Sequence, residues 1–205
     1  MGALEEDIQR EAVAIFNDFE QFTTGTRYIS LLHRSKDGGH NKEYHRRGGF
    51  FITHSPEEYL DALVRLLTLQ TVASKPYRLY ASVNPRSIEK GEKQFKMDML
   101  EADFASKENK DFFYSRLQSR WASSLMKPGS RTQSLFMFDL DNPEGLADPV
   151  APLLIWLSKR ADKVQIIKQY KTPNGYHVIT TPFNPEGLDV PNCEVKKDGL
   201  LLLKG

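Results

Sequence analysis

The sequence lacks the features that define several classes of protein. It has one cysteine, Cys193, among 205 residues, which excludes an internal disulfide framework and a cysteine-rich zinc site and favours a reducing compartment. No apolar run approaches the roughly 20 residues that span a bilayer, and residues 1–11 are acidic, without a basic segment followed by an apolar one. We therefore expect a soluble, cytoplasmic protein with no membrane partner.

An excess of charge of either sign is also missing. The 28 basic and 27 acidic residues leave a net charge of +1, so no global field attracts nucleic acid, and any binding charge has to be local. Hydrophobic residues, by contrast, make up 40% of the chain, with 12 Phe and 8 Tyr among them. This composition predicts a folded protein with a real core, which we interpret as a single domain over residues 1–205.

Hydrophobic periodicity predicts helices and strands in alternation. Helices are expected over residues 3–22, 55–72, 86–127 with an interruption near Lys107, and 145–160; strands are expected over 27–33, 49–53, 77–83, 135–141, 164–169, 176–181 and 198–203. Ser55, Pro56 and Glu58 form a capping signal for the second helix. Because the order shows no clean β-α-β repeat, we expect an α+β fold with a mixed or antiparallel sheet flanked by helices.

Two acids end the most strand-like run of the sequence. Side chains alternate across a strand, so Asp139 and Asp141 share one face, about 7 Å apart. Mg²⁺ and Mn²⁺ are commonly held by one or two carboxylates together with substrate phosphates. The pair therefore indicates a metal site, or alternatively a strand that ends in a solvated turn.

Two further segments suit a phosphate-bearing ligand. The turn Pro173-Asn174-Gly175 predicts a hairpin that delivers His177 onto a strand, where a histidine can also be merely structural. The glycine-rich loop 34–47 has a local charge of +3, from Arg34, Lys36, Lys42, Arg46 and Arg47 against Asp37 and Glu43. Such a loop suits phosphate contact, although basic runs are also common in solvated loops.

The segment Glu194-Val195-Lys196-Lys197-Asp198-Gly199 matches the E-x-K-x-D-G pattern of ATP-dependent DNA and RNA ligases, in which the lysine is adenylated. Ligases have further nucleotide-binding motifs after this lysine, whereas six residues follow Gly199 here. Adenylyl transfer through Lys196 is therefore kept as an alternative, and the segment is interpreted mainly as the entrance of a strand.

Taken in order, three segments resemble the primase-polymerases of the archaeo-eukaryotic primase superfamily found in phages and plasmids. They are Arg78 to Arg86, which ends in a "VNPR" turn, Leu135 to Asp141 with its D-x-D motif, and Pro173 to His177. The resemblance covers residues 78–205 and implies an RRM-like catalytic core. It also implies two Mg²⁺ or Mn²⁺ ions, a nucleoside triphosphate and DNA or RNA as partners, and residence in the host cytoplasm if the protein is phage-encoded.

The resemblance assigns roles to individual residues. Asp139 and Asp141 would be metal ligands and His177 the contact to the incoming nucleotide. A third acid on a later strand completes the family's metal site, and among Glu186, Asp189, Glu194 and Asp198 we predict Asp198, because it opens an apolar strand. The residues expected to bind nucleotide or nucleic acid are Arg34, Lys36, Arg46, Arg47, Asn84, Arg86, Lys171 and Asn174.

The sequence departs from the family in two places. Pro173-Asn174 stands where the second motif usually has Ser-Gly, and the third acid normally lies farther downstream than this chain permits. Two hypotheses therefore follow: a nucleotidyltransferase that extends or starts primers, and a catalytically degenerate nucleic-acid-binding or regulatory phage-type protein.

Overall fold

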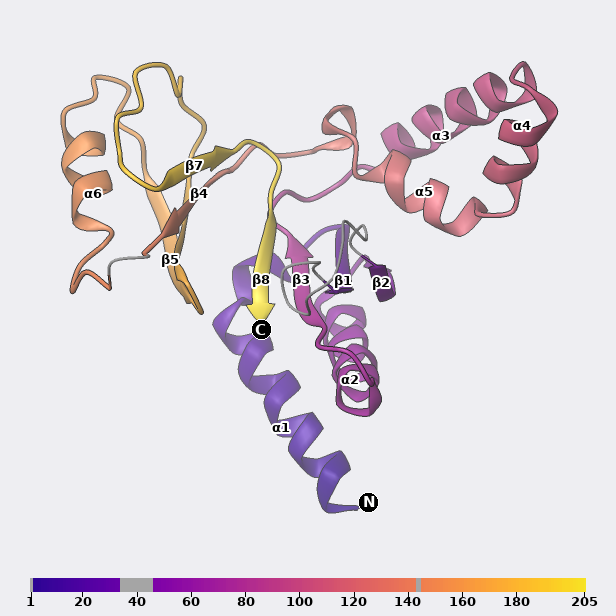
Figure 1. Cartoon of the computed structure of the whole chain (residues 1–205), viewed down its shortest axis with the longest axis horizontal. Coiled ribbons are helices and arrows are strands. Elements are labelled where there is room, and N and C mark those ends of the chain that lie inside the picture. The colour runs from indigo at the N-terminus through magenta and orange to yellow at the C-terminus, as the bar shows by residue number, and fades with distance from the viewer. Residues whose placement is uncertain (1, 34–45, 143–144) are drawn as a thin grey trace.

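The computed structural model describes residues 2–33, 46–142 and 145–205 and arranges them as two β-sheets and a helical arm (Figure 1). In chain order the elements are α1 (Ala3–Asp18), η1 (Glu20–Phe22), β1 (Arg27–His33), β2 (Arg46–Thr53), α2 (Pro56–Val72), β3 (Arg78–Ser82), α3 (Ile88–Asp103), α4 (Lys107–Tyr114), α5 (Leu117–Leu125), η3 (Pro128–Ser130), β4 (Phe136–Asp141), α6 (Ala151–Ser158), β5 (Ile166–Thr172), β6 (Gly175–Thr180), β7 (Cys193–Lys196) and β8 (Leu200–Lys204).

The first sheet has the strand order β2-β1-β3-β8, and all neighbouring strands are antiparallel. Alternate residues of β1 and β3 are buried in one cluster with apolar residues of α1 and α2, as the period of two in a strand requires. The predicted cap of α2 is confirmed: the amide of Glu58 donates to Ser55 Oγ at 3.3 Å. The Glu58 carboxylate in turn accepts from the amide of His54 at 2.7 Å.

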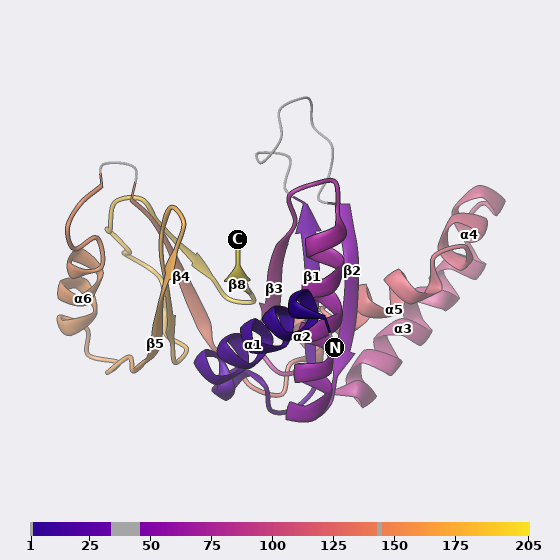
Figure 2. The same ribbon diagram turned by 90° about the horizontal axis from the view of Figure 1, so that it is seen from below.

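Helices α3, α4 and α5 form an arm that projects away from both sheets (Figures 1 and 2). The ring of Phe95 lies 6.0 Å from that of Phe113 and 5.7 Å from that of Trp121, which gives the arm a small aromatic core of its own. Gly91 allows α3 to approach α5, because a Cβ at this position would lie 2.7 Å from a Leu125 methyl carbon. The predicted interruption near Lys107 is confirmed, since α4 begins there.

The second sheet has the order β5-β6-β4-β7, again with antiparallel neighbours. One face is covered by α6, whose Leu153 and Leu157 are buried in a cluster with Phe138 and Val178. The predicted hairpin is confirmed as β5–β6, and its turn residues are Pro173 and Asn174. The following glycine is required by close packing, because a Cβ on Gly175 would lie 1.8 Å from the Leu140 carbonyl oxygen.

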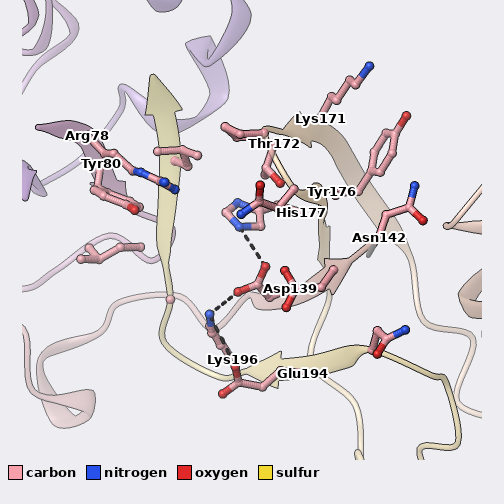
Figure 3. Close-up of a pocket in the computed structure, with 18 of the residues that line it drawn as sticks. Arg78, Tyr80, Asp139, Asn142, Lys171, Thr172, Tyr176, His177, Glu194 and Lys196 are labelled. Atoms are coloured by element: carbon pink, nitrogen blue, oxygen red, sulfur yellow. Dashed lines mark hydrogen bonds and ion pairs between the residues drawn. The ribbon is translucent and has the colours of Figure 1, made fainter. Parts of the chain in front are cut away.

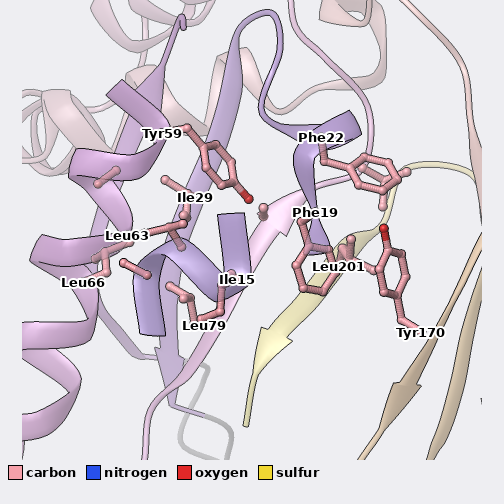
Figure 4. Packing of buried hydrophobic residues seen from close by; sticks show 14 of the residues in the cluster. Ile15, Phe19, Phe22, Ile29, Tyr59, Leu63, Leu66, Leu79, Tyr170 and Leu201 are labelled. Atoms are coloured by element: carbon pink, nitrogen blue, oxygen red, sulfur yellow. The ribbon is translucent and has the colours of Figure 1, made fainter. Parts of the chain in front are cut away.

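The larger core joins the two sheets through the end of α1. Phe19 stacks on Tyr170 of β5 with ring centroids 4.4 Å apart, and Figure 4 shows this pair beside Leu201 of β8. Met137 and Ile179 of the second sheet belong to the same buried cluster as the residues under α2. The second sheet is therefore fixed to the first by apolar packing along one part of its inner face.

Three expectations from the sequence need correction. The chain forms two sheets where one was expected, because alternation of residues identifies strands without identifying their partners. The helix predicted over 145–160 is shorter: Gly145 has φ +65°, and the Asp148 carboxylate accepts from the amides of Val150 and Ala151 at the start of α6. Strand β7 was not predicted as a separate strand.

In the described part of the chain, no helix combines the length and the apolar character needed to cross a lipid bilayer.

Candidate functional site

An open cleft of about 1210 Å³ lies between the inner faces of the two sheets (Figure 3). Its first wall is formed by residues of β1, β3 and β8 that alternate along each strand with members of the core cluster under α1 and α2. Its second wall is formed by β4, β6, β7 and the β5–β6 turn. The lining residues used below are Arg78 and Tyr80 from the first wall, and Asp139, Asp141, Lys171, Asn174, His177, Glu194 and Lys196 from the second.

Strand pairing brings the central residues of the second wall together. Asp139 on β4 is directly opposite His177 on β6 and Glu194 on β7. His177 Nε2 lies 3.3 Å from Asp139 Oδ1, and Lys196 Nζ donates to Asp139 Oδ2. We call Asp139, His177 and Lys196 the cleft cluster.

The cleft cluster keeps Asp139 ionised. Hydrogen bonding from His177, followed by hydrogen bonding and charge from Lys196, holds the pKa of Asp139 well below its usual range against the opposing effect of burial. His177 is itself 8% exposed in its side chain, and its buried Nδ1 has no hydrogen-bond partner among the described residues. The cluster therefore presents a fixed negative charge beside an imidazole with one unused nitrogen.

Asp141 is exposed and lines the cleft on the same face of β4 as Asp139. Two carboxylates on one face suit Mg²⁺ or Mn²⁺ that arrives with a phosphate-bearing substrate, because such ions take the remaining ligands from water and phosphate. Among the described residues, no group of three or more His, Cys, Asp or Glu side chains could hold a metal ion.

The prediction that Asp198 supplies the third metal ligand stays a prediction, and in this structure the carboxylate is paired with Arg86. Its carboxylate lies at the edge of the cleft, but Arg86 Nη2 is 2.5 Å from Asp198 Oδ1 and Arg86 Nη1 is 3.0 Å from Oδ2. Asn84 Nδ2 also donates to Oδ1 at 3.3 Å. The guanidinium therefore contacts both oxygens of Asp198 and ties this acid to the chain around it.

Asn84 and Arg86 were predicted to bind nucleotide, and the structure instead buries both at 0% and 2% exposure. Asn84 exchanges two hydrogen bonds with the backbone of Leu135. Arg86 donates to the carbonyls of Met126 and Lys127 as well as to Asp198. We call Asn84, Arg86 and Asp198 the junction cluster, because it joins the end of the arm, β3 and the chain between β7 and β8.

The other predicted contacts divide into two groups. Lys171 and Asn174 line the cleft beside His177, as expected. Arg34 and Lys36 lie outside the described residues, and so do the side chains of Arg46 and Arg47, whose backbones pair with β1. The proposed role of this basic loop therefore stays a prediction.

Sequence reasoning missed the first wall of the cleft. Arg78 and Tyr80 alternate with Leu79 and Ala81, which belong to the core cluster with α1 and α2, so the period-two pattern could have placed them on a separate face. It could not have shown that this face lies opposite Asp139. It also ranked Glu194 below Asp198, although strand pairing places Glu194 opposite Asp139.

Comparison with known proteins finds no family model that matches the chain and no curated protein or solved structure that is similar to it.

Proposed function

We propose that the chain is a metal-dependent nucleotidyltransferase of primase-polymerase type that works in the cleft between its two sheets. The observation that carries the proposal is the convergence of two separate sequence motifs. Asp139 and Asp141 of the first motif and His177 of the second line one cleft, and Asp139 contacts His177. Both motifs belong to the segments that resemble primase-polymerases.

The topology of the second sheet supports the same proposal. Strands β4 and β5 are both antiparallel to β6, which lies between them, and α6 connects them along the chain. This is the split β-α-β arrangement of ferredoxin-like folds, the kind of core that the resemblance implies. The D-x-D motif lies at the end of β4, an inner strand with a partner on each side.

The charges along the cleft suit a nucleoside triphosphate. Asp139 and Asp141 are the residues that would hold Mg²⁺ or Mn²⁺, and the ion would neutralise charge on the triphosphate. Arg78 from the first wall and Lys171 from the second add two cations to the lining of the cleft, and Figure 3 shows Arg78 on the wall across from Asp139. Both cations suit phosphate oxygens. The Asp139 carboxylate faces the His177 Nε2 at 3.3 Å and so orients the ring of the predicted nucleotide contact.

DNA or RNA is the second partner that this activity requires. The chain's net charge of +1 supplies no general attraction for a polyanion, so we assign template binding to the local excess of charge in residues 34–47. Substituting Arg46 and Arg47 with Glu is then expected to weaken binding to all sequences alike and to reduce its dependence on salt.

The test is nucleotide incorporation. The full chain is incubated with a labelled primer on DNA and RNA templates, nucleoside triphosphates and Mn²⁺ or Mg²⁺, and Asp139→Asn is expected to reduce incorporation about 100-fold or more. Asp189→Asn is the matched control, because Asp189 is exposed and does not line the cleft. Absence of incorporation by the wild type on every template, or full activity of Asp139→Asn, would overturn the proposal.

One observation favours the second candidate, a binding protein without turnover. Asp198 is already paired with Arg86, and both oxygens of Asp139 already have partners from the protein. This candidate predicts saturable nucleotide binding by a wild type that incorporates nothing. Adenylyl transfer through Lys196 predicts instead a covalent AMP adduct, yet that amine is engaged with Asp139 and lies 3.6 Å from Glu194.

A further inference from the structure

We propose that the chain associates with a second copy of itself through the outer face of α3, and that the two α3 helices pack in antiparallel orientation. The surface belongs to the helical arm and lies away from the cleft. The inference goes beyond the proposed function and does not depend on it.

The outer face of α3 carries an apolar stripe. Met97, Leu100 and Phe104 follow one another at spacings of three and four residues, so they lie on one side of a helix. Phe104 belongs to this side although α3 ends at Asp103, because its backbone is still in the helical region, at φ −92° and ψ −4°. The three side chains are 54%, 51% and 85% exposed. We call these three residues the outer stripe.

Helix α3 therefore has two apolar faces. Its inner face contacts α4 and α5 through the Phe95 ring and includes the buried Gly91 and Ala102. One apolar face is enough to hold a surface helix, whereas a helix that is apolar on both sides is normally covered on both. The arm extends away from both sheets (Figures 1 and 2). The outer stripe is thus an exposed apolar surface of the kind that marks interaction sites.

The distribution of charge along α3 points to a second copy as the occupant. Residues 88–96 contain three lysines and two glutamates, whereas residues 97–103 contain three acidic residues and no basic one. A helix with a basic first half and an acidic second half is complementary to itself when two copies run in opposite directions. Antiparallel pairing also places opposite ends of the two helix dipoles together. Parallel pairing would instead oppose the two acidic halves.

A two-fold axis near Leu100 gives the best use of the outer stripe. Met97 of each copy then faces Phe104 of the other copy, and the two Leu100 side chains meet at the centre. Lys96 and Asp103 are seven residues apart, so they flank the outer stripe on the same side. Antiparallel pairing brings Lys96 of each copy beside Asp103 of the other, whose side chain is 42% exposed. The interface is isologous and small, so association should be weak and dependent on concentration.

Analytical ultracentrifugation of the full chain tests this inference. From about 5 to about 500 µM protein we expect a monomer–dimer equilibrium with a dissociation constant on the order of 100 µM or lower. Leu100→Glu places a charge at the centre of the apolar contact and should weaken dimerisation at least about tenfold. Ile155→Glu is the matched control, because Ile155 is similarly exposed, at 56%, but lies on α6 outside the arm. It should leave the equilibrium unchanged.

Exchanging the charges of Lys96 and Asp103 tests the orientation of the two helices. Lys96→Glu and Asp103→Lys should each weaken dimerisation several-fold, because each opposes like charges at both symmetry-related contacts. An equimolar mixture of the two variants should dimerise like the wild type, because both contacts then pair opposite charges again. Asp103→Lys also removes the pair of Asp103 with Lys110 at 2.8 Å, so the recovery in the mixture decides the test.

Three results would overturn the inference. A wild type that stays monomeric up to about 500 µM leaves the outer stripe to a different partner. A dimer that Leu100→Glu does not weaken uses another surface, and a mixture of the two charge variants that fails to recover excludes the antiparallel arrangement. If Leu100→Glu does not fold, Phe104→Glu changes a side chain that is almost fully exposed and is judged by the same criterion.

Discussion

Two polar clusters flank strand β7, and they differ in how completely the protein satisfies them. In the junction cluster the Arg86 side chain is fully buried, and every strong contact of Asp198 is with Arg86 or Asn84. In the cleft cluster Asp139 is 27% exposed, Lys196 is 34% exposed and His177 keeps a buried nitrogen without a partner. An ion-paired aspartate thus has a fully buried basic partner in one cluster and a partly exposed one at an open cleft in the other.

The comparison explains why the sequence alone could not distinguish the roles of Asp139 and Asp198. A carboxylate whose oxygens are both bound to a buried guanidinium is tied to the fold, because leaving that charge unpaired is costly. A carboxylate bound by a movable lysine at an open cleft keeps capacity for a ligand. Asp139 and Asp198 both lie beside apolar strand segments in the sequence, so only their three-dimensional partners distinguish them.

The largest effect should come from breaking the junction cluster. Arg86→Met leaves Asp198 charged, half-enclosed and without its main partner, which should lower the free energy of unfolding by about 3–5 kcal/mol and the melting temperature by roughly 10 °C. Urea denaturation measures the loss. Lys93→Met is the control, because its pair with Glu89 is 72% and 76% exposed and should contribute little to stability. A loss below about 1 kcal/mol for Arg86→Met would contradict the comparison.

The sequence predicted the local features of both clusters but not the long-range contacts within them. The strand that carries Asp139 and the turn before His177 were predicted, because alternation and turn chemistry are local. The pairing of β4 with both β6 and β7 is not local, so the contact of Asp139 with His177 and the position of Glu194 were not predictable from spacing. The "VNPR" turn was recognised as a motif, but motif matching could not show that Asn84 and Arg86 point into the interior.

A smaller effect is expected from the cleft cluster, and it should depend on pH. Asp139→Asn should cost about 1–2 kcal/mol at neutral pH, since hydrogen bonds to a partly exposed charge are replaced by neutral ones. The pKa of Asp139 is lowered in the folded state by His177 and Lys196, so its contribution is present above the unfolded pKa of about 3.9 and is lost as the pH falls below that value.

Melting temperatures of the wild type and Asp139→Asn, measured from pH 7 to pH 2.5, check this sign. The difference should stay nearly constant down to about pH 4.5 and shrink at lower pH. A difference that disappears between pH 7 and pH 5 would show that Asp139 is not held ionised by its neighbours. Asp189→Asn again serves as the control and should show little difference at any pH.

The smallest effect concerns the reaction rate of the Cys193 thiol. Cys193 lies on β7, the strand that connects the two clusters. Burial, with a lesser contribution from the Asp139 charge, raises the pKa of the Cys193 thiol to about 12, so the native thiol should react with a disulfide reagent at pH 8 at least about 100-fold more slowly than the denatured chain. Asp198→Asn weakens the anchor that follows β7 and should raise the rate several-fold by favouring local opening. Asp139→Asn removes only the contact with the partly exposed Lys196 of β7 and a small contribution to the thiol pKa, so the native rate should rise by less than about twofold. Equal acceleration by both substitutions would mean that the cleft cluster holds β7 as firmly as the junction cluster does, and the division between structural and functional acids would then fail.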